Sequence, residues 1–256
     1  MVMNNPDKDW ETFGASDPYW AVITDDRYRT KRIDGEAIKS FFNSGEEYVV
    51  EIFRDIHEGL DREFRPIKVV DFGCGVGRIT IPLSRICKVV LAIDVADSML
   101  EEAEKNCLVR NIKNVRFVKS DDQLSNVKGK YDFIHSFIVF QHIPPRRGER
   151  IFERLVAILN DGGVGAIHFT YFKRASKLSK VIGFLGTKAP FGAKLINLLQ
   201  KRKINSPIMQ MNDYNVNTIL RILQENNCHK IHLRFTQHSR HYGVIVFFQK
   251  TVIRNM

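Results

Sequence analysis

A short apolar stretch ends in an acid and is followed by three glycines at alternate positions, in the run VVDFGCGVGR at residues 69–78. Glycine lets the backbone turn tightly and approach a ligand closely, and a helix that begins after such a loop presents free N–H groups. The pattern therefore predicts a binding site for a nucleotide-like ligand, placed between the end of a strand and the start of a helix.

The spacing of these glycines differs from the dinucleotide fingerprint G-x-G-x-x-G, because position 78, where the third glycine would fall, is Arg78. Asp71 comes just before the first glycine. Its carboxylate would repel a pyrophosphate but would stabilise an ammonium group. We therefore expect a positively charged ligand, and an enzyme linked to a nicotinamide dinucleotide is disfavoured.

Short β-rich runs alternate with helical runs from about residue 69 onward, which indicates βα units around a largely parallel sheet. We expect five strands, over residues 68–73, 89–94, 115–120, 131–137 and 164–171. Helices are expected over 78–86, 98–109, 146–159 and 216–224. Two further β-rich runs, 231–237 and 242–249, are joined by only a few residues, so they predict a closing antiparallel hairpin.

The loop from Asp71 to Gly77 resembles the first motif of the class I methyltransferases that use S-adenosyl-L-methionine, acid-x-G-x-G-x-G. That cofactor carries a positive amino group and a positive sulfonium. The resemblance covers roughly residues 69–171, and it implies an α/β, Rossmann-like sheet of seven strands, five parallel plus a C-terminal antiparallel hairpin, with helices on both faces. The segment DPYWA at 17–21 is similar to a small-molecule and glycan-associated, type 11-like subset.

The resemblance also implies roles for individual residues. Asp94 would accept both ribose hydroxyls, Met99 would lie against the adenine, and Asp121 would accept from the adenine amino group. His142, in a Q-H-I-P motif, is the candidate general base; alternatively it hydrogen-bonds a loop carbonyl or borders the methionine end of the cofactor. The full set of candidate cofactor contacts is Asp71, Gly73, Cys74, Gly75, Gly77, Arg78, Asp94, Val95, Met99, Asp121, Asp122, Phe137 and His142. His135 and His168 lie within strands and are expected to be core or supporting histidines.

Residues 1–64 are expected to form an N-terminal aromatic segment and helical cover, and residues 65–256 the core. The cover contains an aromatic-rich stretch over 10–28 and a helix over 37–60, which we expect to break at the Asn-Ser-Gly sequence of residues 43–45. Aromatic residues in such a stretch more often serve packing than ligand contact.

The net charge is +10, and a basic stretch accounts for nearly all of the excess, because no acid occurs between Asp161 and Asp213. We place a cap insertion there, at about residues 172–212. Its lysines alternate with apolar residues at helical spacing, so it could lie on an anionic membrane or close over a hydrophobic or acidic substrate. The alternative is a cap packed on the core with solvated lysines.

The sequence favours transfer of a methyl group to oxygen, in preference to nitrogen, of a small-molecule, glycan or lipid-linked acceptor. Nucleic acid is disfavoured, because the Asn/Asp-Pro-Pro-aromatic element that holds a base amino group is replaced by SFIV at 136–139. A non-catalytic module that binds an anionic membrane or a partner through the cap is the alternative. The N-terminus lacks a signal-peptide pattern and the cysteines lack close pairing, so we expect a cytoplasmic protein, with peripheral membrane contact left open, and no metal.

Overall fold

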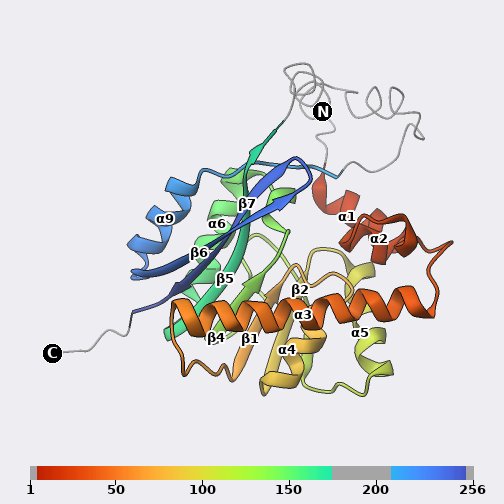
Figure 1. Cartoon of the computed structure of the whole chain (residues 1–256), viewed down its shortest axis with the longest axis horizontal. Helices are drawn as coiled ribbons and strands as arrows, with labels where there is room; N and C mark the ends of the chain where they lie inside the picture. The colour runs from red at the N-terminus through yellow and green to blue at the C-terminus, as the bar shows by residue number, and fades with distance from the viewer. Residues whose placement is uncertain (1–4, 175–208, 252–256) are drawn as a thin grey trace.

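The computed structural model describes residues 5–174 and 209–251, so the expected basic cap at about 172–212 lies almost entirely outside the described residues. The described residues form a seven-stranded sheet between helices (Figure 1). The strand order is β3-β2-β1-β4-β5-β7-β6. The expected fold class is confirmed.

The first five strands pair in parallel. They are β1 (Lys68–Phe72), β2 (Val89–Asp94), β3 (Val115–Lys119), β4 (Tyr131–Ser136) and β5 (Leu159–Lys173). The hairpin of β6 (Lys230–His238) and β7 (His241–Gln249) pairs antiparallel, with β7 against β5. The central strands are continuous apolar runs because helices cover both of their faces.

Strand β5 begins five residues earlier than expected, at Leu159 instead of residue 164. Residues 159–163 form an irregular start of the strand. Gly162 adopts φ 76°, and the register with β4 shifts between Tyr131 and Phe133. The local glycine signal was correct for a bend, but pairing with β4 carries the strand through it.

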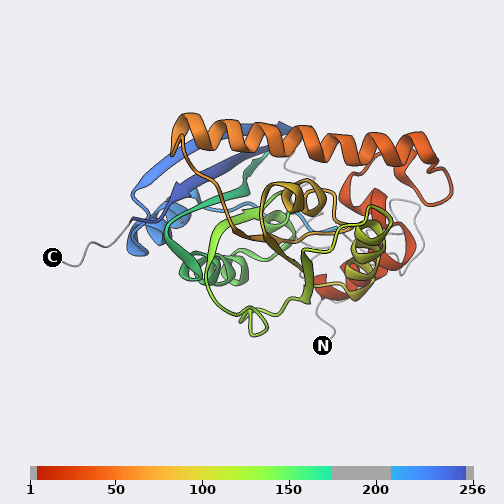
Figure 2. The same cartoon turned by 90° about the horizontal axis from the view of Figure 1, so that it is seen from below.

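Helices α3 (Gly35–Gly59) and α4 (Thr80–Ile86) contribute to the core on one face of the sheet, and α6 (Pro145–Ala157) and α9 (Val216–Glu225) to the core on the other. Helix α5 (Asp97–Val109) contacts β2 and β3. Figure 2 shows α3 lying across the whole length of one face. Its buried Ile52 and Ile56 pack in one cluster with Phe133 of β4 and Phe247 of β7.

The expected break in the N-terminal helix is wrong, since α3 runs without interruption from Gly35 to Gly59. Gly45 serves close packing instead of a break: a Cβ there would lie 2.2 Å from the carbonyl oxygen of Arg78. Ser44 satisfies its hydroxyl within the helix by donating to the Phe41 carbonyl. The glycine therefore lets α3 approach the backbone that follows the glycine loop.

The N-terminal cover is helical, with α1 (Pro6–Ser16), α2 (Pro18–Val22) and a short 3-10 turn, η1 (Asp26–Tyr28). Helix α1 is capped by the side chain of Asn5, which accepts from the amide of Asp7. The cover packs in one apolar cluster with α5 and the start of α3, through buried residues that include Phe13, Tyr28 and Phe41.

Candidate functional site

The glycine loop connects β1 to α4 at the carboxyl edge of the parallel strands. Gly73, Gly75 and Gly77 have φ values of 77°, 52° and 86°, in the left-handed region that favours glycine. The amides of Gly73 and Cys74 both donate to the carbonyl of Ile93, which folds the loop onto the end of β2. The alternate glycine spacing is therefore required by the backbone of this turn.

Asp94 ends β2 and fastens this loop. Its Oδ2 accepts from the amide of Gly75 at 2.9 Å, and its Oδ1 accepts from the amide of Ala96 at 3.1 Å. Burial raises the pKa of this carboxyl to about 6, against the opposing effect of the backbone hydrogen bonds. Each oxygen keeps a second lone pair, so the carboxylate can still accept from a ligand's hydroxyl groups.

Asp71 is directed into the protein and is 2% exposed. Its Oδ2 accepts from the hydroxyl of Thr80 at 2.6 Å, and its Oδ1 lies 2.9 Å from Nδ1 of His135. The other ring nitrogen of His135 lies 3.2 Å from the hydroxyl of Tyr48 on α3. The carboxylate that we expected to face an ammonium group is thus bonded at both oxygens to the sheet and α4, and its ligand contact stays a prediction.

The chain that follows β4 is strained at Ile138, a β-branched residue with φ 60°. This conformation sets Val139 against the glycine loop, where a Cβ at Gly73 would lie 2.2 Å from a Val139 methyl group. The ring of Phe137 lies 4.3 Å from Tyr48 and 5.3 Å from His168, centre to centre. Strain of this kind in a sheet-edge loop favours a functional role for residues 137–139.

His142 lies in the turn η2 (Phe140–His142) after β4 and is buried. Its Nδ1 lies 2.7 Å from the carbonyl of Gln210, and its Nε2 lies 3.1 Å from Nε2 of Gln141. Burial lowers the pKa of His142 to about 4. Of the three roles considered from the sequence, the structure shows the hydrogen bond to a loop carbonyl, and the other two stay predictions.

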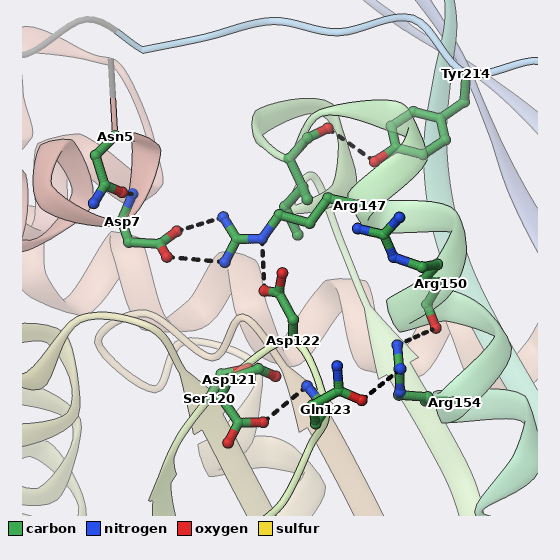
Figure 3. Close-up of polar contacts among 11 residues, drawn as sticks. Asn5, Asp7, Ser120, Asp121, Asp122, Gln123, Arg147, Arg150, Arg154 and Tyr214 are labelled. Atoms are coloured by element: carbon green, nitrogen blue, oxygen red, sulfur yellow. Dashed lines mark hydrogen bonds and ion pairs between the residues drawn. The ribbon is translucent and has the colours of Figure 1, made fainter. Parts of the chain in front are cut away.

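The loop after β3 holds the two acids expected near the adenine. Asp121 is exposed, and its Oδ1 accepts from the amides of Gln123 and Ser125, which lowers its pKa. Asp122 instead binds Nε of Arg147 on α6 at 2.6 Å. The same guanidinium donates from both terminal nitrogens to Asp7 of α1, at 2.8 and 2.9 Å (Figure 3). Arg147 thereby ties the N-terminal cover to this loop.

The cover also contacts the other elements of the edge. Glu11 of α1 accepts from the amides of Asp97 and Ser98 at the start of α5, and the ring of Trp10 meets the ring of His142 at 4.9 Å. Val22 of α2 lies over the glycine loop, where a Cβ at Gly75 would be 2.8 Å from its methyl group. Helices α1 and α2 therefore contact four segments that are distant in sequence: the glycine loop, the start of α5, the turn η2, and α6 through Arg147.

Other expected contacts fall beside this edge. Met99 is buried in α5, Cys74 is buried in the glycine loop, Val95 follows Asp94, and Arg78 begins the turn into α4. His168 is buried in β5, as expected, with Nε2 2.9 Å from the hydroxyl of Thr236. The roles of these residues toward a ligand stay predictions.

Sequence reasoning missed Thr80, Tyr48, Arg147 and Glu11. Thr80 stands at the start of a helix after the glycine loop, so its position could have been read from the sequence. The other three reach the site from α3, α6 and α1, and no local pattern marks them.

Within residues 5–174 and 209–251, no group of His, Cys, Asp or Glu side chains is arranged to hold a metal ion. In the same residues, no helix combines the length and apolar character needed to cross a bilayer.

Residues 69–163 match the family model of the methyltransferase domain. A ribosomal protein L11 methyltransferase of Lactobacillus helveticus is 33% identical over 108 residues, which are 41% of this chain and 32% of that protein. A probable cobalt-precorrin-6B C(15)-methyltransferase of Methanocaldococcus jannaschii is 34% identical over 92 residues, or 36% of this chain and 45% of the relative. The chain thus spans less than half the length of these curated relatives.

Solved structures resemble the chain over nearly its whole length. A magnesium protoporphyrin IX methyltransferase from Synechocystis, with S-adenosylhomocysteine bound, superposes with a TM-score of 0.62 at 18% identity, covering 95% of this chain and 97% of that one. The N-methyltransferase NodS of Bradyrhizobium japonicum gives 0.60 at 13% identity, with 96% and 98% covered. At such identities the likeness shows the fold. Residues 69–163 therefore resemble a methyltransferase domain, in a chain that has the Rossmann-like fold of these methyltransferases.

Proposed function

We propose that this chain transfers a methyl group from S-adenosyl-L-methionine to an oxygen, in preference to a nitrogen, of a small-molecule, glycan or lipid-linked acceptor. The observation that carries the proposal is the joined pair of Asp94 and the glycine loop. A partly buried carboxylate at the end of β2 accepts a hydrogen bond from the left-handed glycine turn at the end of β1, at the carboxyl edge where ligands bind in such sheets.

The residues of this edge fit the cofactor. The Asp94 carboxylate has free lone pairs for the two hydroxyl groups of a ribose. Gly73 and Gly75 pack against methyl groups of Val139 and Val22, so the methionine part would lie beside these two side chains. Asp121, which is exposed on the loop after β3, would accept from the adenine amino group. When bound, the cofactor supplies a methyl group already activated by its sulfonium.

The chain's own part in the reaction is alignment and exclusion of water. Methyl transfer is an in-line displacement, so the protein has to fix donor and acceptor in one geometry. The roof formed by α1 and α2, bonded through Glu11 and Arg147, would shield the donor from solvent. His142 is neutral and engaged at both ring nitrogens, so we assign it the positioning of the loop at Gln210 in preference to proton transfer.

The acceptor would enter beside the strained turn of residues 137–139. The ring centres of Phe137 and His238 lie 6.0 Å apart, and both rings contact the buried ring of His168, which gives an aromatic cluster between β4, β5 and the hairpin. Supporting examples of small-molecule acceptors come from the full-length structural neighbours, one named for magnesium protoporphyrin IX and one for N-methylation. The curated relatives also include enzymes named for ribosomal protein L11 and for uracil in tRNA. The SFIV sequence at 136–139 argues against an amino group of a nucleic-acid base as the acceptor, and the labelling experiment below separates the other classes.

The direct test incubates the purified chain with cell extract and S-adenosylmethionine carrying a labelled methyl group, followed by mass identification of the labelled product. The expected result is label in a small or lipid-soluble compound, at an oxygen. The Asp94→Ala variant is the control and should lose the labelling together with calorimetrically measured cofactor binding.

A chain that binds the cofactor but labels nothing, and that sediments with vesicles of anionic lipid, would support the non-catalytic module in place of the enzyme. Label appearing only in RNA or protein would contradict the proposed acceptor class.

A further inference from the structure

Arg78 is a buried cation without a carboxylate partner. It is 9% exposed, and its Nε makes no hydrogen bond in the described part of the chain. Its guanidinium has one hydrogen bond there, in which Nη1 donates to the hydroxyl of Ser44 at 3.3 Å. Burial lowers the pKa of Arg78, the direction expected when a charge loses water without full compensation.

Such a group is costly to the fold. Moving a charge out of water is repaid only when an opposite charge and well-formed hydrogen bonds replace the lost hydration. Asp71 acts on Arg78 through space, but its two oxygens are already bonded to Thr80 and His135. No ion pair joins Arg78 to an acid among the residues that the structure describes, so the guanidinium is prepared for an anion from outside the chain.

The position of Arg78 indicates which anion it would meet. The residue follows Gly77 directly, and its backbone carbonyl lies in close contact with Gly45 of α3. Its Cζ lies 5.9 Å from the ring centre of Tyr48. The Tyr48 hydroxyl in turn reaches His135, and its ring reaches Phe137. Arg78 is therefore connected through Tyr48 to the end of β4, whereas Asp94, the acid proposed for the ribose, ends β2.

We propose that Arg78 binds the carboxylate of the amino-acid part of the cofactor, a role that rests on the proposed function. A guanidinium can grip a carboxylate through two parallel N–H groups, and it is planar and always charged. A singly charged carboxylate fits a site that already contains Asp71 and Asp94, whereas a pyrophosphate would face two acids across one arginine. Arg78 would thus recognise the negative group of the amino-acid part, whereas the sequence suggested Asp71 for its positive group.

The test compares S-adenosylmethionine with decarboxylated S-adenosylmethionine, which keeps the amino group and the sulfonium and lacks only the carboxylate. Calorimetry on the wild-type chain should show about 10- to 150-fold tighter binding of the carboxylate form, the range expected for hydrogen bonds to charged groups. Arg78→Met should abolish that preference while leaving the affinity for the decarboxylated ligand nearly unchanged. Arg78→Lys, which keeps a point charge, should retain part of it.

Arg85→Met is the matched control, because Arg85 lies in α4, which begins two residues after Arg78, and because its side chain is exposed and pairs with Glu46 of α3. It should keep the full preference. Thermal unfolding without ligand gives a second readout: because Met removes an uncompensated buried charge, Arg78→Met should unfold at the same or a higher temperature than the wild type.

A wild-type chain that binds S-adenosylmethionine without preferring the carboxylate would overturn the inference and leave the proposed function standing. So would an Arg78→Met variant that keeps the preference, or one that loses stability and weakens both ligands equally. A wild-type chain that binds neither ligand would overturn the proposed function, and the inference with it.

Discussion

If Asp94 binds the ribose as proposed, the affinity for the cofactor should depend on pH. The ionised carboxylate offers an acceptor oxygen to each ribose hydroxyl, and burial raises the pKa of this group from its ordinary value of 3.8 to about 6. As the pH falls through that value, the carboxyl takes up a proton and one acceptor oxygen becomes a hydroxyl. Affinity for S-adenosylhomocysteine should therefore rise with increasing pH and level off above about 7.

The magnitude follows from the ionised fraction. With a pKa of about 6, roughly a quarter of the Asp94 side chains are ionised at pH 5.5 and nearly all at pH 7.5. If the protonated form does not bind, the dissociation constant should be about fourfold larger at pH 5.5 than at pH 7.5. Isothermal titration calorimetry at the two pH values measures this ratio, and circular dichroism at each pH verifies that the chain stays folded.

Asp94→Asn supplies the control, because the amide keeps the shape of the side chain and does not titrate. The variant should bind more weakly, since its NH2 group replaces one of the oxygens that accept from Gly75 and Ala96. Its affinity should also lose the pH dependence. An unchanged wild-type affinity between the two pH values, or the same fourfold change in Asp94→Asn, would refute the assignment of this carboxyl to the ribose.

Two further predictions concern the attachment of α1 and the buried His168. Arg147→Met should free α1 from the loop after β3, and the loss of two partly exposed ion pairs, worth about 1–2 kcal/mol together, should speed hydrogen exchange of the α1 amides. Arg221→Met, which removes the exposed ion pair with Glu225, serves as the control and should leave the exchange rates of the α1 amides unchanged. Equal exchange rates of these amides in Arg147→Met and the wild type would contradict the role of the Arg147 contact. His168 is held neutral by burial, which lowers its pKa to about 3, so protonation favours the unfolded chain below pH 6.5. Unfolding free energy should therefore fall as the pH drops below 6.5, and His168→Gln should reduce that slope by about 1.4 kcal/mol per pH unit in denaturant titrations; an identical slope would count against the burial argument.

Much of the architecture could be predicted from local patterns. Strands β1 to β4 and both hairpin strands were placed to within a residue at each end, because apolar runs bounded by turn residues follow the pleat of a covered sheet. The errors arose where tertiary contacts override local preference. Gly45 suggested a break, but its lack of a side chain is used for contact with Arg78, and pairing with β4 extends β5 through the glycines before residue 164.

The sequence alone determined the succession of strands and helices and the positions of the glycine loop and of Asp94 at the end of the next strand, because these depend on residues close together in the chain. The direction in which buried charges point was decided only by the tertiary structure. The Asp71 side chain points inward because hydrogen bonds with Thr80 and His135 offset the loss of its hydration. Arg78 lies against α3 because Gly45 leaves room for the Arg78 backbone. Those partners come from separate helices and strands. The cost of removing each charged group from water and the hydrogen bonds that offset this cost therefore arise only when the elements pack together.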